Sequence, residues 1–90
     1  MEKIYSKIDK SLICCHVSKK DATQYRNDMG DTSEILQSSV RLLDEGTHVK
    51  PHKHLPIIKQ TIGTQEAWIV IEGKILAKIY DINDEYLLDL

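Results

Sequence analysis

The sequence has no long apolar run, and this absence excludes two classes of protein. Its first residues, Met1 to Lys7, hold no apolar stretch of the length that a signal peptide requires. Elsewhere the apolar runs extend over a few residues only, far short of a membrane span. We therefore expect a soluble, cytoplasmic protein without a membrane partner.

Cysteine is scarce as well. The chain has two cysteines, Cys14 and Cys15, which are neighbours in the sequence. Adjacent cysteines rarely bridge each other because the geometry is strained, and no CxxC spacing indicates a redox or soft-metal site. We interpret both as partly buried thiols in a reducing compartment.

The chain also lacks an excess of positive charge. Twelve basic side chains stand against fourteen acidic ones, giving a net charge of −2, and no basic stripe stands out. Nucleic acid is therefore not an expected partner.

The length of 90 residues predicts one small domain, which buries only about 60% of its unfolded surface. Domains of this size often depend on a metal, a disulfide or a partner chain.

Two regions differ in character. Residues 1–34 form a mixed, polar N-terminal segment. Within it the sequence predicts a strand at residues 11–17, a short helix at residues 22–25 that is introduced by Ser18 and Asp21, and a turn at residues 27–31. Residues 35–90 read as successive short strands separated by turns, at residues 35–43, 47–54, 66–72, 74–80 and 85–90.

Short strands with short connections predict an all-β chain with antiparallel neighbours, a barrel or a sandwich. The alternating apolar residues of the later strands are the expected core: Trp68, Val70, Ile75, Ala77 and Ile79. A closed barrel needs more strands than these. We therefore expect an incomplete barrel, either because the chain is a piece of a longer product or because a second copy completes the sheet as a homodimer.

The segment with the clearest chemistry contains His52 and His54. Residues two apart in a strand point to the same face, about 6.6 Å apart, so both imidazoles can converge on one ion. Glu66, at the start of a later predicted strand, can supply a carboxylate to the same ion. Two histidines and one carboxylate suit iron, manganese, zinc or nickel and leave positions open for water or substrate.

The spacing of these residues resembles the first motif of the cupin superfamily. Five residues separate Gly46 from His52, and six separate Glu66 from Gly73, as in that motif. The eleven residues between His54 and Glu66 form a longer gap than the family has, although loop insertions cost little free energy. The histidine of the second cupin motif has no counterpart after Gly73, so no fourth ligand is identified.

The resemblance covers residues 36–82 and implies a cupin-like antiparallel β-barrel, or jelly roll, around a divalent metal. Within the superfamily the chain resembles small cupins of bacterial polysaccharide and sugar-nucleotide biosynthesis, which implies a sugar or sugar nucleotide as ligand. An isomerase, an epimerase, a dioxygenase and a protein without catalysis all remain open, because a fold does not fix a function. His48 is a candidate acid–base residue. The alternative is a non-catalytic small-molecule-binding module or a dimeric interaction module without metal.

Overall fold

The computed structural model describes residues 1–90 and consists of short strands and loops with almost no helix. The elements are β1 (Glu2–Tyr5), β2 (Leu12–His16), the 3-10 turn η1 (Lys19–Asp21), β3 (Asn27–Asp28), β4 (Ser39–Val40), β5 (Lys78–Tyr80) and β6 (Tyr86–Asp89). The expectation of an all-β chain is thereby confirmed. None of the helical structure is long and apolar enough to cross a membrane.

The six strands form three separate two-stranded sheets, β1–β2, β3–β4 and β5–β6. The chain divides into two compact units, one formed by Met1–His16 with Glu66–Leu90 and the other by Val17–Gln65. The division expected at residues 34 and 35 falls inside the second unit, because β3 pairs with β4 across it.

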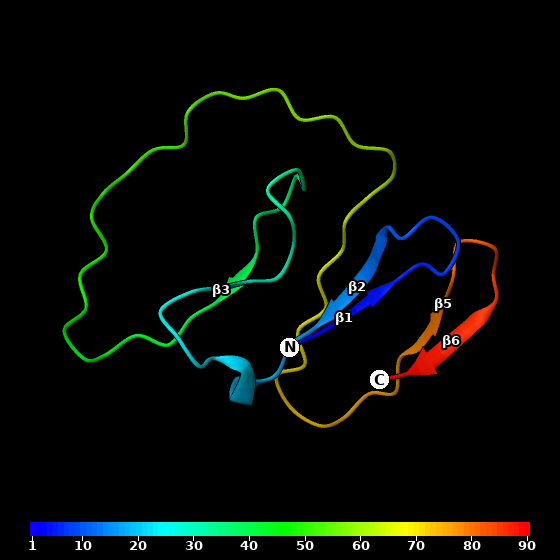
Figure 1. The fold of residues 1–90 in the computed structure, drawn as a ribbon. Helices are drawn as coiled ribbons and strands as arrows, with labels where there is room; N and C mark the ends of the chain where they lie inside the picture. The colour runs from blue at the N-terminus through cyan, green and yellow to red at the C-terminus, as the bar shows by residue number, and fades with distance from the viewer. The chain divides into compact units, whose positions relative to one another are not determined.

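In the first unit, β1 and β2 form an antiparallel hairpin, blue in Figure 1. Its register places Ile4 opposite Cys14, and Ile4 is the one buried apolar side chain, 6% exposed. Asp9 stabilises the turn because its carboxylate accepts hydrogen bonds from the backbone N–H and the hydroxyl of Ser11, at 2.9 and 2.6 Å. Lys10 completes the turn with a φ of 65°.

The second hairpin of this unit joins β5 and β6, orange to red in Figure 1. Lys78 lies opposite Asp89, a cross-strand pair of opposite charge, which favours this register. The rings of Tyr80 and Tyr86 meet edge to face, with centroids 6.0 Å apart, a favourable aromatic geometry. The turn begins at Asp81, whose backbone N–H donates to the carbonyl of Glu85 at 2.7 Å.

The two hairpins are connected by a buried polar contact between their turns. Asp81, 6% exposed, accepts a hydrogen bond from the backbone N–H of Lys7 at 2.9 Å. The hydroxyl of Ser6, 1% exposed, donates to the same carboxylate. The Ser6 oxygen in turn accepts the backbone N–H groups of Ile8 and Asp9, at 3.1 and 3.3 Å. A buried carboxylate is tolerated here because these donors compensate for its lost hydration.

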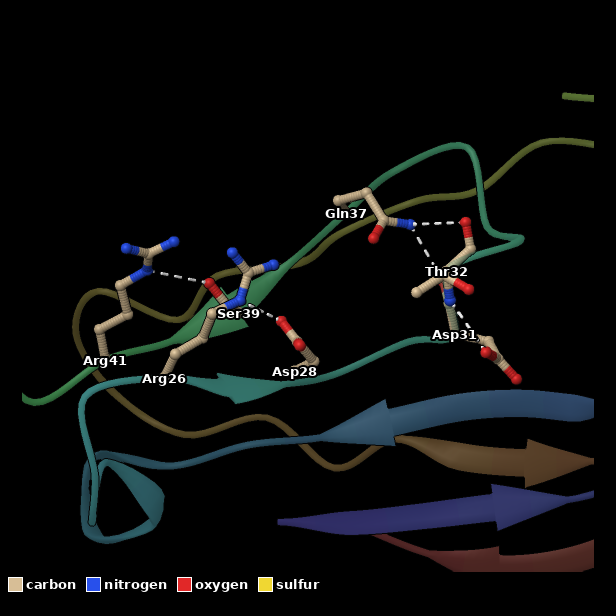
Figure 2. Close-up of polar contacts among 7 residues, drawn as sticks. All are labelled: Arg26, Asp28, Asp31, Thr32, Gln37, Ser39 and Arg41. Atoms are coloured by element: carbon tan, nitrogen blue, oxygen red, sulfur yellow. Dashed lines mark hydrogen bonds and ion pairs between the residues drawn. The ribbon is translucent and has the colours of Figure 1, made fainter. Parts of the chain in front are cut away.

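The second unit holds the small β3–β4 hairpin, shown in Figure 2. Arg26 forms an ion pair with Asp28 at 2.6 Å on this hairpin. The side-chain amide of Gln37 bridges the backbone carbonyls of Asp31 and Glu34 at 3.0 and 2.9 Å, and so closes the connection between the strands.

Several predicted elements are shorter than expected or absent. Residues 35–43 contribute only β4, and residues 74–80 only β5. Residues 47–54 and 66–72 form no strand, so those two predictions are wrong. A strand requires a neighbour that pairs with its N–H and C=O groups, and neither segment has one. Proline at position 51 further removes a donor from the first of them.

The predicted short helix is also wrong in position. Ser18 and Asp21 do define a turn, because the Asp21 carboxylate accepts the backbone N–H and the hydroxyl of Ser18, at 2.8 and 3.0 Å. The resulting 3-10 turn covers Lys19–Asp21 and ends at Ala22. The predicted core is only partly buried: Ala77 and Ile79 are half-buried, whereas Trp68, Val70 and Ile75 are exposed.

Candidate functional site

His52 and His54 lie in an exposed, extended segment of the second unit. Their ring centroids are 5.6 Å apart and the ring planes are tilted by 52°. A nitrogen bound to zinc lies about 2.0–2.1 Å from the ion, so two rings on one ion have centroids at most roughly 6 Å apart. The separation of the two rings is within that limit, although the segment is not a strand.

A backbone carbonyl group orients the ring of His52. His52 Nδ1 lies 3.0 Å from the carbonyl oxygen of Lys50. A carbonyl oxygen only accepts, so Nδ1 carries the proton in this contact, and in the neutral imidazole Nε2 then presents its lone pair. Metal-ligating histidines commonly donate their second ring nitrogen to a carbonyl or carboxylate, which orients the ring. The sequence reasoning did not identify this contact, although proline at position 51 favours the extended backbone that allows it.

Glu66 begins the second part of the first unit, Glu66–Leu90, whereas both histidines belong to the second unit. Its carboxylate accepts a hydrogen bond of 3.4 Å from the indole N–H of Trp68. The structure therefore gives Glu66 a polar neighbour on its own segment. The structure as a whole contains no cluster of three or more His, Cys, Asp or Glu side chains that could hold a metal ion.

The remaining candidate residues surround the histidines in sequence. His48 is exposed, as are Lys50 and Lys53. Lys59 is half-buried, and its ammonium group donates to the backbone carbonyl of Glu34 at 2.5 Å. Lys59 therefore anchors the loop of residues 55–65, in addition to contributing positive charge.

The loop between His54 and Glu66, residues 55–65, is held at two points. Besides Lys59, the side chain of Gln65 accepts the backbone N–H of Leu36 at 2.9 Å and donates to the carboxylate of Glu34. Between these anchors lies an open depression of about 380 Å³, lined by Ile35, Leu36, Thr61, Gly63, Thr64 and Gln65. Its lining is mostly apolar, with Thr61 and Thr64 as the polar residues not already bonded, a composition typical of small-molecule pockets.

Thiol chemistry has little support from the geometry. Cys14 is half-buried on β2, and burial, together with the neighbouring Cys15 and Glu2, raises the pKa of its thiol. A raised pKa lowers the fraction of thiolate, which is the reactive form. The histidine segment thus remains the part of the chain with the most distinctive chemistry.

Comparison of the chain with known protein families, with characterised proteins and with solved structures finds no match.

Proposed function

We propose that this chain binds a divalent metal through His52, His54 and Glu66, as a cupin-type protein acting on or holding a small polar metabolite. The observation that carries the proposal is the arrangement of the two imidazoles. Their centroids are 5.6 Å apart, and His52 donates Nδ1–H to the Lys50 carbonyl, which leaves Nε2 for an ion. The surrounding fold in this proposal is a cupin-like β-barrel.

The donor set fits a divalent ion of iron, manganese, zinc or nickel, with Glu66 as the third ligand. Two imidazoles and a carboxylate leave coordination positions free, and a metal bound there would act as a Lewis acid on a ligand oxygen. The exposed segment that carries His52 and His54 gives a ligand direct access. His48, four residues before His52, is the proposed proton-transferring group if the protein is an enzyme.

The proposed ligand class is a sugar or sugar nucleotide, and the proposed assembly is a cytoplasmic homodimer. Lys50 and Lys53 are exposed beside the histidines, and two ammonium groups near a metal favour an anionic ligand such as a phosphosugar. The depression beside residues 55–65, which is lined mostly by apolar surface, offers Thr61 and Thr64 as polar partners for such a ligand.

The experiment is elemental analysis of protein purified without a histidine tag, followed by dialysis against each candidate metal. We expect one ion per chain in the wild type and loss of that ion in a His52→Ala/His54→Ala double variant. Glu66→Gln should weaken binding, because the amide is a poorer ligand for the ion than the carboxylate. His16→Ala is the matched control, since His16 is also exposed but lies on β2. Equal metal content in the control and the double variant would contradict the proposal.

A further inference from the structure

The segment Ala67–Ile71 of the first unit is strongly apolar and strongly exposed. Trp68 is 78% exposed, Ile69 83% and Ile71 94%, and Val70 is about half exposed at 47%. These residues have high strand propensity, and the segment contains neither proline nor charge. Such a sequence is typical of a strand that is covered by another chain or by more of its own sheet.

The backbone of this segment is also available for pairing. None of the residues from Glu66 to Leu76 takes part in a backbone–backbone hydrogen bond, and none belongs to a strand. Backbone N–H and C=O groups beside large apolar side chains favour addition of a further strand.

The charged residues that flank this segment indicate which strand would pair with it. In an antiparallel pair of two identical segments centred on Val70, Glu66 of each copy lies opposite Lys74 of the other. The same register places Ile69 opposite Ile71, so the largest aliphatic side chains face each other. A parallel, in-register pair would instead place Glu66 against Glu66 and Glu72 against Glu72, and like charges directly opposite are unfavourable.

The end of the segment is compatible with this register. Gly73 has a φ of 86° and bends the chain directly after Glu72. In the paired arrangement Gly73 lies opposite Ala67, and these are the two smallest residues of the segment. The flexible Lys74 side chain then reaches Glu66 beyond the bend.

We propose that residues 66–74 form the contact of a homodimer, pairing antiparallel with the same residues of a second copy about a two-fold axis at Val70. A two-fold axis uses the same surface on both copies and gives a closed dimer. The proposal rests on the homodimer proposed above and specifies its surface; it shares one residue, Glu66, with the proposed metal site.

The first test is a disulfide across the axis. In a Cys14→Ala/Cys15→Ala background, Val70→Cys places two thiols opposite each other, where cross-strand Cβ atoms are about 4.5–5.5 Å apart. Oxidation should give a covalent dimer. Ile75→Cys is the matched control because Ile75 is similarly exposed, at 55%. In this register the two copies of residue 75 are roughly 33 Å apart, so no dimer should form. A dimer without a Val70→Cys cross-link would overturn the pairing while leaving dimerisation intact.

The second test exchanges the charges in otherwise wild-type protein, in EDTA so that metal binding by Glu66 plays no part. Glu66→Lys and Lys74→Glu each place like charges opposite, and each should weaken the dimer about tenfold in analytical ultracentrifugation. The double variant restores opposite charges and should recover the wild-type dissociation constant. Failure of the double variant to recover, a monomeric wild type, or assemblies larger than a dimer would each refute the proposal.

Discussion

The Oδ2 atom of Asp81 lies 2.9 Å from the backbone nitrogen of Lys7, although the two residues are 74 positions apart in the sequence. With the hydroxyl of Ser6 on the same carboxylate, this contact joins the turn of the β1–β2 hairpin to the turn of the β5–β6 hairpin. An isolated two-stranded hairpin is marginally stable in water. The contact is therefore expected to stabilise both hairpins.

Ser6→Ala should lower the free energy of unfolding by about 1–2 kcal/mol, because it removes a buried donor to the Asp81 carboxylate. Urea denaturation followed by circular dichroism measures the change. Ser33→Ala is the matched control, since Ser33 is exposed, and it should leave the midpoint unchanged. Equal effects of the two substitutions would show that the buried contact contributes no stability.

Acidification should weaken the same contact. The hydrogen bond from Ser6, followed by the backbone N–H groups of Lys7 and Ile82, holds the pKa of Asp81 below its usual range, against the opposing effect of burial. A lowered folded pKa contributes stability above the unfolded value of about 4, and this contribution is lost as the pH falls through the folded value.

Urea midpoints measured from pH 7 down to pH 2.5 test this dependence. The wild type should lose stability below about pH 4. Asp81→Asn should be less stable than the wild type at pH 7 and should show a smaller decrease on acidification. Parallel curves for the two proteins would assign the acid sensitivity to other carboxylates, such as Asp9, whose pKa is lowered mainly by the Ser11 hydroxyl.

Ile4 should be the most sensitive apolar position of the first unit. Its side chain is buried at 6% exposure, whereas Ile8 in the adjoining turn is 55% exposed. Removal of a buried methylene costs about 0.5–1.5 kcal/mol for an isoleucine-to-valine change. Ile4→Val should therefore shift the urea midpoint, and Ile8→Val should not. A larger effect at Ile8 would argue against the burial described for β1.

Metal should stabilise the folded chain if His52 and His54 bind it. A ligand at about 100 times its dissociation constant adds about 2.7 kcal/mol to the free energy of unfolding when it binds the native state alone. A thermal-unfolding series with zinc, manganese, nickel and iron(II) should show an upward shift for at least one metal. The His52→Ala/His54→Ala variant should show none, and His16→Ala should behave as the wild type.

Cys14 should react slowly with iodoacetamide. Burial raises the pKa of its thiol, and the thiolate is the nucleophile. The alkylation rate, followed by peptide mass analysis, should continue to rise above about pH 8.5, where ordinary thiols are half ionised. Unfolding in urea should accelerate the reaction at neutral pH. A fast reaction of the folded protein at pH 7 would contradict the burial of this thiol.

Local sequence patterns predicted the elements that depend on neighbouring residues. The apolar runs that became β2 and β6 were identified, because strand propensity acts over a few positions. The strand β1 was missed, since Glu2 and Lys3 have low strand propensity and only pairing with β2 makes the segment extended. The strands predicted at residues 47–54 and 66–72 had the appropriate composition but no partner to pair with.

For the candidate site, the sequence alone identified His52, His54 and Glu66, because metal-ligating residue types recur at recognisable spacings. The tertiary structure added what spacing does not encode: the carbonyl of Lys50 on His52, and the anchors of Lys59 and Gln65 on the Glu34 region. It also decided the contact between Ser6, Lys7 and Asp81. A hydrogen bond between residues so far apart depends on how two hairpins meet, and no periodicity or local propensity of the sequence carries that information.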